Sequence, residues 1–149
     1  MSDQNIASTD EPSPAAAELL AQMPFAVASG VELSEVRPET VRGRLDWSAE
    51  RCTAGGILHG GALMTLADAV GAVCGYLNLP EGAGTATIES KTNFFRGVAS
   101  GTVHAEAKPL HVGGTLIVVQ TDVRDDRGRR VVQTTQTQAV IAPRPPSGS

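Results

Sequence analysis

The chain has 149 residues, of which 41% are hydrophobic and 19% are charged, a composition typical of a single globular domain. Sixteen acidic residues against twelve basic ones give a net charge of −4. Because binding to a phosphate backbone needs a basic surface, this balance argues against a nucleic-acid partner. The two cysteines, Cys52 and Cys74, form neither a CxxC pair nor a metal-ligand spacing, so we expect a cytoplasmic protein without a metal site.

The N-terminal residues 1–14 are rich in Ser, Asp, Glu and Pro and show no periodicity that could bury a face. They predict a disordered tail, and they lack the basic segment and apolar run of a signal peptide. Strong helix formers from Ala15 to Met23, bounded by two prolines, predict a short packing helix. We expect one domain over residues 15–142 and a tail over residues 143–149, which are rich in Pro, Ser and Gly.

Alternating polar and apolar residues predict strands before and after a long apolar segment. VELSEV and the stretch from Thr40 to Trp47, joined by Arg37-Pro38-Glu39, indicate a first hairpin. The strands predicted after the apolar segment cover residues 85–95, 102–110, 114–124 and 130–141. Since short loops join consecutive strands, the sheet should be antiparallel. The expected fold class is α+β, with a long central helix wrapped by a curved sheet of about five or six strands.

The apolar segment runs from Ile57 to Leu79, and within its 23 residues only His59 and Asp68 can ionise near neutral pH. Its composition predicts a helix of about five turns that begins near Gly60 and ends before Pro80. A carboxylate at its centre costs several kcal/mol unless it is paired, hydrogen-bonded or protonated. That carboxylate, together with four glycines, argues against a membrane span and requires another explanation.

The helical period divides this segment into two sides. The residues that share the apolar face are Leu63, Leu66, Ala67 and Val70. Asp68 falls instead in a stripe of mostly small residues, among them Gly61 and Gly75. Because small residues allow close approach, we expect another backbone or a slender ligand to pack against Asp68.

Three stretches carry a resemblance to a known family: HGGALMTLAD at 59–68, NFFRG at 93–97 and the strands from Gly101 to Val140. They resemble the hotdog-fold acyl-CoA thioesterases of the PaaI type, which include the phenylacetate-pathway thioesterases and one branch of the 4-hydroxybenzoyl-CoA thioesterases. The resemblance covers roughly residues 30–142. It implies a long helix wrapped by an antiparallel sheet, an acyl-CoA substrate, and homodimers that assemble into homotetramers with active sites at the subunit interface.

The chemistry of the residues agrees with a thioesterase. Hydrolysis of a thioester needs a base or nucleophile, which Asp68 can supply, and a donor for the oxyanion, which the Gly60 amide can supply at a helix N-terminus. The two residues lie eight positions apart, about 12 Å along one helix. Two subunits can therefore present Asp68 and Gly60 to one carbonyl more easily than one subunit can. The resemblance gives His59 a supporting role in holding the loop and the substrate.

Structural alternatives stay open for each of these residues. Asp68 could be a buried carboxylate that anchors a neighbouring backbone turn. His59 could act only as an N-terminal cap, and the glycine pair could serve only the turn. In relatives an Asn or Gln stands six residues before the histidine, where this chain has Thr53, whose hydroxyl is shorter and carries one donor. Ala72 stands where some relatives have a hydroxyl residue.

The phosphates of coenzyme A require local positive charge in a protein of net charge −4. The resemblance assigns substrate or CoA contacts to Gly61, Arg96, Gly114, Thr115 and Arg144. Arginine suits phosphate because of its bidentate fork. For the three arginines at 127, 129 and 130 we expect only solvated surface charges.

The sequence therefore predicts a thioesterase that hydrolyses a small or medium acyl-CoA, aromatic acyl groups included, without a cofactor of its own. The alternative from a different class is an acyl-CoA-binding or sensing module that does not turn its ligand over, which Thr53 favours. A hydratase on the same fold is disfavoured, because those enzymes typically pair Asp with His on one helix and no histidine follows Asp68 at that spacing.

Overall fold

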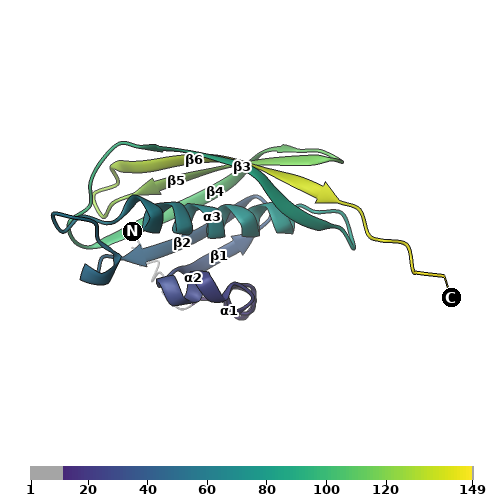
Figure 1. Cartoon of the computed structure of the whole chain (residues 1–149), viewed down its shortest axis with the longest axis horizontal. Helices are drawn as coiled ribbons and strands as arrows, with labels where there is room; N and C mark the ends of the chain where they lie inside the picture. Colours follow the sequence, from purple (N-terminus) through teal and green to yellow (C-terminus); the bar gives the residue numbers. More distant parts are fainter. Residues whose placement is uncertain (1–11, 149) are drawn as a thin grey trace, which may run out of the picture.

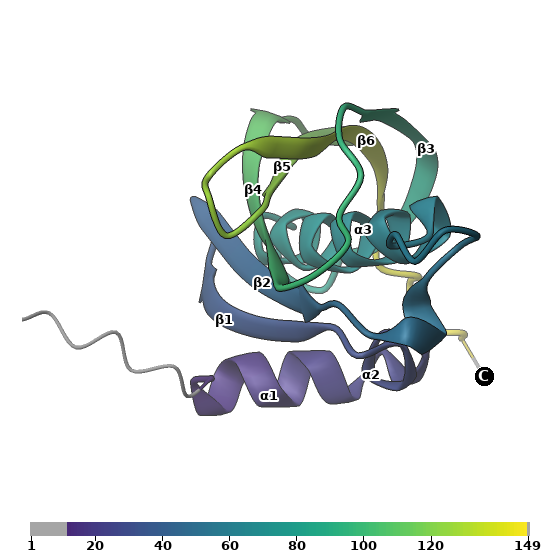
Figure 2. The ribbon, with the colours of Figure 1, turned by 90° about the vertical axis from the view of Figure 1, so that its left-hand side faces the viewer.

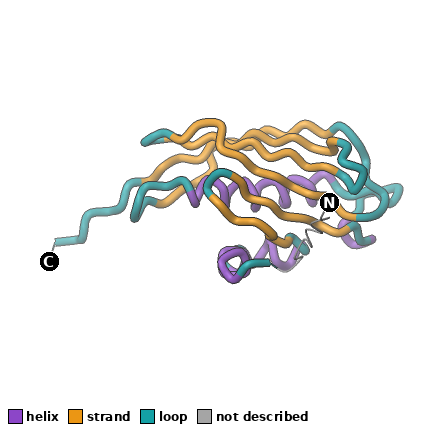
Figure 3. The backbone as a smooth tube through the Cα atoms, turned by 180° about the vertical axis from the view of Figure 1, so that it is seen from behind, coloured by secondary structure: helices purple, strands orange, loops and turns teal. Residues whose placement is uncertain are grey.

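The computed structural model describes residues 12–148. The helix α1 (Pro14–Ala21) begins where Ser13 accepts a hydrogen bond from the Ala16 amide at 3.2 Å. The predicted disordered tail lies outside the described residues except for its last three, and there it is wrong at Pro14, which already belongs to α1. Residues 142–148 form no helix or strand and lead away from the sheet (Figures 1 and 3).

A second helix, α2 (Pro24–Ser29), follows α1 directly. The sequence predicts only one helix here, because Pro24 is interpreted as its end. Proline also suits the first position of a helix, where its fixed φ fits and its missing N–H is not needed. The chain therefore turns at Met23 and starts again, and α2 ends at Gly30 with a left-handed φ of 90°.

Six strands form one antiparallel sheet in the order β1-β2-β4-β5-β6-β3. Their bounds are β1 (Glu32–Arg37), β2 (Thr40–Asp46), β3 (Gly84–Phe94), β4 (Thr102–Val112), β5 (Leu116–Arg124) and β6 (Arg130–Ile141). A short 3-10 helix, η1 (Ala49–Arg51), precedes the central helix. Every predicted strand is present within two residues of its predicted ends, and the α+β class is confirmed.

The central helix α3 (Gly60–Leu77) lies in the hollow of the curved sheet, while α1 and α2 lie beside β1 (Figures 1 and 2). The predicted apolar face is confirmed, since Leu63, Leu66, Ala67 and Val70 are all buried. By length and composition α3 could cross a membrane, with a mean hydropathy of 1.4, but half of it is buried inside the fold. Its apolar character is therefore explained by its place in the core.

The small residues of α3 face the sheet as well as the outside. Gly71 and Gly75 are buried and allow Gln136 and Gln138 of β6 to lie directly against the helix backbone. The Gln138 amide donates to Thr87 Oγ1 at 2.9 Å. Neither Gln136 amide atom has a hydrogen-bond partner among the described residues. The stripe predicted to share a side with Asp68 is thus divided between the core and the exterior.

The strand β3 stands at an edge of the sheet and pairs only with β6. None of its eleven residues is buried. Ile88 and Phe94 on this strand are 61% and 50% exposed, respectively. A long, unprotected edge strand with exposed apolar side chains is the kind of surface that another strand covers.

Candidate active site

The N-terminus of α3 presents an amide without an internal partner. His59 is the N-cap: its Nδ1 accepts a hydrogen bond from the Gly61 amide at 2.8 Å. Its carbonyl accepts from the amides of Ala62 and Leu63 at 2.9 and 3.2 Å. No residue in the range 12–148 accepts a hydrogen bond from the Gly60 N–H, as expected in the first turn of a helix. His59 therefore caps α3, and within the described residues Gly60 keeps a free donor beside it.

The loop before α3 is held on both sides, which fixes the position of the Gly60 amide. The Leu58 amide donates to the Val98 carbonyl at 2.9 Å, and the His59 amide donates to the Arg51 carbonyl at 2.8 Å. The Arg51 side chain in turn donates from Nε to the Ser29 carbonyl and from Nη1 to the Asp46 carbonyl, both at 2.8 Å. Arg51, which belongs to no motif in the sequence, thus links α2, β2 and the cap of α3.

The ring of Phe94 packs over Gly60. A Cβ atom at position 60 would lie 3.3 Å from Phe94 Cε1, closer than most real contacts. In the sequence Phe94 indicates only the register of β3, and its contact with Gly60 appears only in the structure. It explains a glycine at this position by close approach rather than by turn geometry.

Asp68 lies two turns along α3 from the cap, and its side chain is exposed in the single chain. Within residues 12–148 it has no hydrogen-bond or ion-pair partner, so it does not anchor a neighbouring turn. The surrounding protein still removes part of its hydration, and this desolvation raises the pKa of the Asp68 carboxyl above its usual value. The cost expected from the sequence is thus reduced by exposure, and the carboxylate remains free to act.

Thr53 lies in the same loop as His59 and is exposed. Its amide donates to the Ile57 carbonyl at 2.8 Å across a turn that contains Gly55 and Gly56 at φ of 84° and 74°. In the part of the chain that the structure describes, its hydroxyl makes no hydrogen bond. The side chain is therefore available to a ligand, although the single chain does not orient it.

The residues expected to hold coenzyme A fall into two groups at opposite ends of the sheet. Arg96 follows β3 at the end where Phe94 pairs with Val132, close to Gly60. Gly114 and Thr115 form the turn between β4 and β5, and the Thr115 carbonyl accepts from the amide of Val140.

From position 132 to position 140 β6 extends about 26 Å at 3.3 Å per residue. Arg144 follows β6 at the far end, beyond Ile141. One chain therefore does not bring Arg96 together with Gly114, Thr115 and Arg144.

A cleft of about 560 Å³ opens beside the cap of α3. Its lining comes from three segments: Phe25, Ala28 and Ser29 of α2, Glu50, Arg51 and Cys52 around η1, and His59, Gly61, Ala62 and Thr65 at the start of α3. The wall made by α2 is not expected from the sequence, because that helix is not predicted. The proline at position 24 and the glycine at position 30 are the signals that could have revealed it.

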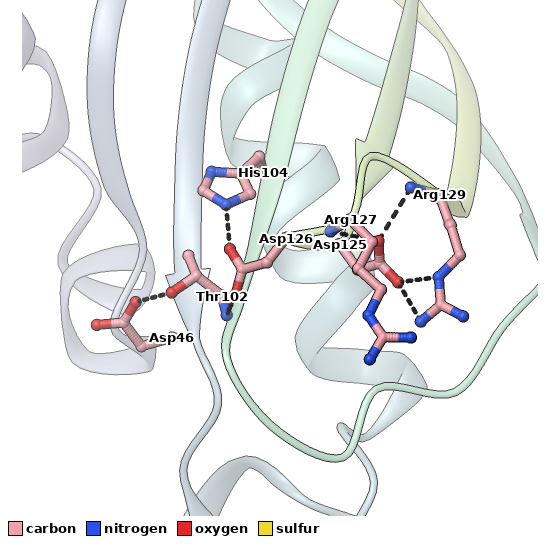
Figure 4. Close-up of polar contacts among 7 residues, drawn as sticks. All are labelled: Asp46, Thr102, His104, Asp125, Asp126, Arg127 and Arg129. Atoms are coloured by element: carbon pink, nitrogen blue, oxygen red, sulfur yellow. Dashed lines mark hydrogen bonds and ion pairs between the residues drawn. The ribbon is translucent and has the colours of Figure 1, made fainter. Parts of the chain in front are cut away.

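A second group of polar side chains lies away from α3, near the turn between β5 and β6 (Figure 4). His104 Nε2 lies 2.8 Å from Asp126 Oδ1, and the Thr102 amide donates to Asp126 Oδ2 at 3.0 Å. The hydrogen bond with His104 has the larger effect, and together these bonds lower the pKa of the Asp126 carboxyl. Arg129 pairs with Asp125 at 2.8 Å. Since these groups satisfy one another at the surface, we assign them to the stability of the turn.

The arginines predicted to be surface charges behave as expected. Arg129 and Arg130 pair with Asp125 and Asp122, and Arg127 is exposed. In the described chain no cluster of three or more His, Cys, Asp or Glu side chains could hold a metal ion.

Comparison with known proteins identifies the family. The profile of the thioesterase superfamily matches residues 55–132. The 1,4-dihydroxy-2-naphthoyl-CoA hydrolase of Escherichia coli K12 is 35% identical over 86 residues, which span 58% of this chain and 63% of that enzyme. A putative esterase of Haemophilus influenzae is 30% identical over 112 residues, which span 75% of this chain and 81% of that protein.

The fold agrees with this match. The crystal structure of a thioesterase from Haemophilus influenzae superposes with a TM-score of 0.79 at 26% identity, covering 87% of this chain and 92% of that one. The shared architecture is the hotdog fold that the resemblance implies, with one helix wrapped by an antiparallel sheet. The chain therefore belongs to the thioesterase superfamily.

Proposed function

We propose that this protein is a thioesterase that hydrolyses a small or medium acyl-CoA, aromatic acyl groups included, to the free acid and coenzyme A. One observation carries the proposal: within residues 12–148 the Gly60 amide at the start of α3 has no hydrogen-bond acceptor, and the Asp68 carboxylate on the same helix is exposed and has no partner. The first is a donor for an oxyanion and the second is a base or nucleophile. The similarity to an E. coli acyl-CoA hydrolase supports the substrate class.

The chemistry follows from these two groups. With Asp68 as the base, its carboxylate takes a proton from water while the water oxygen bonds to the thioester carbon. The carbonyl oxygen becomes an oxyanion that accepts a hydrogen bond from the Gly60 N–H, strengthened by the helix dipole. The C–S bond then breaks, and the thiolate takes the proton from Asp68. With Asp68 as the nucleophile, its carboxylate oxygen attacks the thioester carbon, and the C–S bond breaks to release the thiolate and leave an anhydride. Water then hydrolyses the anhydride to the free acid and the Asp68 carboxylate, and the proton released goes to the thiolate.

We propose that the site is completed by a second subunit. Gly60 and Asp68 of one helix lie about 12 Å apart, too far to act on one carbonyl. The exposed edge of β3 can pair with β3 of a second copy, which extends the sheet across a twofold axis. Such a homodimer would bring Asp68 of one subunit toward Gly60 of the other, and dimers would then assemble into the homotetramer that the family resemblance implies.

The same pairing of β3 strands would bring together the residues expected to contact coenzyme A, which lie at opposite ends of the sheet within one chain. In an antiparallel pair of β3 strands, the far end of one subunit lies beside the near end of the other. Gly114, Thr115 and Arg144 of one subunit would then approach Arg96 and Gly61 of its partner. Neither Arg96 nor Arg144 forms an ion pair within residues 12–148, so both charges are available to phosphates.

The test measures release of free thiol from a panel of acyl-CoAs by the wild type and by Asp68→Asn. Loss of acid–base catalysis should reduce kcat by about a hundredfold or more. The matched control is Glu18→Gln, an exposed carboxylate on α1, which should leave kcat unchanged. Full activity of Asp68→Asn with every substrate would refute the assignment.

A second candidate function is an acyl-CoA-binding module without turnover. Thr53 favours it, because its hydroxyl is unoriented in the single chain and replaces the amide found in relatives. The two functions are separated by calorimetric binding of CoA together with the thiol-release assay. Tight CoA binding with no hydrolysis of any thioester would decide for the binding module.

A further inference from the structure

We propose that Gln136 of β6 is a positioning residue for thioester hydrolysis. Together with Gln138 it fills the spaces left by two glycines of α3 and fixes this helix along its axis. The helix carries both Asp68 and the Gly60 amide, so this contact sets where the two groups stand. The proposal rests on the proposed function, because it takes Asp68 and the Gly60 amide as the groups that act on the thioester.

The two glutamines lie directly against the backbone of α3. A Cβ atom on Gly71 would overlap Oε1 of Gln136, and a Cβ atom on Gly75 would lie 3.0 Å from Cγ of Gln138. Gln136 and Gln138 are 0% and 1% exposed, respectively. Each glutamine therefore occupies a space that a side chain on the helix would otherwise fill, and close approach requires glycine at both helix positions.

The spacing of the two contacts matches on the helix and on the strand. Gly71 and Gly75 are four residues apart, about 6.0 Å along α3 at 1.5 Å per residue. Gln136 and Gln138 are two residues apart, about 6.6 Å along β6 at 3.3 Å per residue. Each glutamine therefore meets its own glycine, and a shift of α3 along its axis would drive both side chains against residues that carry a Cβ atom.

The two glutamine side chains differ in their hydrogen bonds. The Gln138 amide donates to Thr87 Oγ1 at 2.9 Å, and its Oε1 accepts from Thr85 Oγ1 at 3.1 Å, so Gln138 is held on β3. Neither amide atom of Gln136 has a partner among the described residues, although burying an unbonded amide destabilises a core. The length of the Gln136 side chain, rather than its hydrogen bonding, is therefore what places the helix.

Asp68 stands next to these glycines on α3. At about 100° per residue, Gly60, Gly71 and Gly75 share one side of the helix. Asp68 comes three residues before Gly71, about 60° around the helix and about 4.5 Å along its axis. A rotation or shift of α3 on β6 therefore moves the carboxylate directly. A displacement of about 1 Å at the reacting groups can lower a rate by about a hundredfold.

The test empties and then refills the space beneath α3, with the acyl-CoA that the wild type hydrolyses fastest. Gln136→Ala should lower kcat by about tenfold or more, with a smaller change in KM. Gln136→Met keeps the length without the amide, so kcat should stay within about threefold of the wild type and the midpoint of urea unfolding should rise. The matched control is Leu33→Ala, a buried position on β1 at the opposite edge of the sheet, which should lose stability with kcat unchanged. An equal kcat in Gln136→Ala and Leu33→Ala, or in Gln136→Ala and Gln136→Met, would overturn the proposal.

The position of α3 separates this proposal from the proposed function. Crystal structures of the wild type, Gln136→Ala and Gln136→Met are superposed on β5 and β6. The Cα atom of Asp68 should move by about 1 Å in Gln136→Ala, the scale to which catalysis is sensitive, and stay in place in Gln136→Met. If the wild type hydrolyses no thioester but this movement occurs, the proposed function fails and the role of Gln136 in placing α3 stands. An unmoved helix in Gln136→Ala overturns that role, whatever the activity.

Discussion

The contact between Arg51 and Gly30 can be tested by removing each residue and then both. Gly30 ends α2 at a φ of 90°, and a Cβ atom there would overlap the guanidinium of Arg51. Gly30→Ala should therefore expel the same side chain that Arg51→Ala removes. We expect the two changes to be strongly non-additive in the free energy of unfolding.

The contacts in the structure give the expected loss in the free energy of unfolding for each variant. Arg51→Ala loses two hydrogen bonds of 2.8 Å from a charged donor to the carbonyls of Ser29 and Asp46, and because water can reach part of this site the cost should be about 2 kcal/mol. Gly30→Ala adds a left-handed alanine, about 1–2 kcal/mol, to the loss of those same bonds. The two single losses each include the Arg51 hydrogen bonds, whereas the double variant loses them once, so its loss of stability should be about 2 kcal/mol smaller than the sum of the two single losses.

Urea unfolding followed by circular dichroism measures all three variants against the wild type. Gly128→Ala is the matched control, because its φ is 75° and no other atom lies within 4 Å of a Cβ built there, so it reports the backbone cost alone. Additive effects of Gly30→Ala and Arg51→Ala would refute the proposed dependence of the Arg51 hydrogen bonds on Gly30. A Gly30→Ala variant no less stable than Gly128→Ala would refute it as well.

Four further predictions concern the central helix. Desolvation raises the pKa of Asp68, so the acid limb of kcat/KM against pH should lie above the usual carboxylate value of about 3.9; a limb at or below that value contradicts it. For the same reason the folded state holds the Asp68 proton more tightly than the unfolded state does. Stability should thus fall as pH rises from the unfolded-state pKa through the folded-state pKa.

Asp68→Asn should accordingly be more stable than the wild type at pH 7, with the difference gone below pH ~4 in thermal melts. Gly71→Ala places a methyl group on the Gln136 amide and should cost about 1–3 kcal/mol, partly recovered by adding Gln136→Ala. Leu66→Ala empties a fully buried site and should cost about 2–5 kcal/mol, measured by urea unfolding; a smaller loss would mean that α3 can collapse toward the sheet.

Local sequence patterns were sufficient for most of the architecture. The strands show a period of two and the central helix a period of 3.6, and each pattern is set by which face is buried. Leu63 and Leu66 could therefore be assigned to the core before the sheet was known. Gly60 and Asp68 could be named because the motif that contains them has a fixed spacing along one helix.

The features that the sequence does not predict depend on contacts between residues that are distant in the chain. Pro24 begins a helix as readily as it ends one, and only the packing of α2 beside the loop before α3 shows which occurs. The role of Arg51 cannot be predicted from the sequence, because its partners Ser29, Asp46 and His59 come close together only in the folded chain. The opposite positions of Arg96 and Thr115 follow from the pairing of β3 and β5 with β6.

By itself the sequence determined the fold class, the central helix and the two groups suited to thioester chemistry, because burial patterns and helix termini are local. Only the tertiary structure decided that Asp68 is exposed and unpartnered in the single chain, that Phe94 covers Gly60 and that α2 makes a cleft beside them. These features arise where segments far apart in the chain come into contact, and no periodicity in any one segment records them.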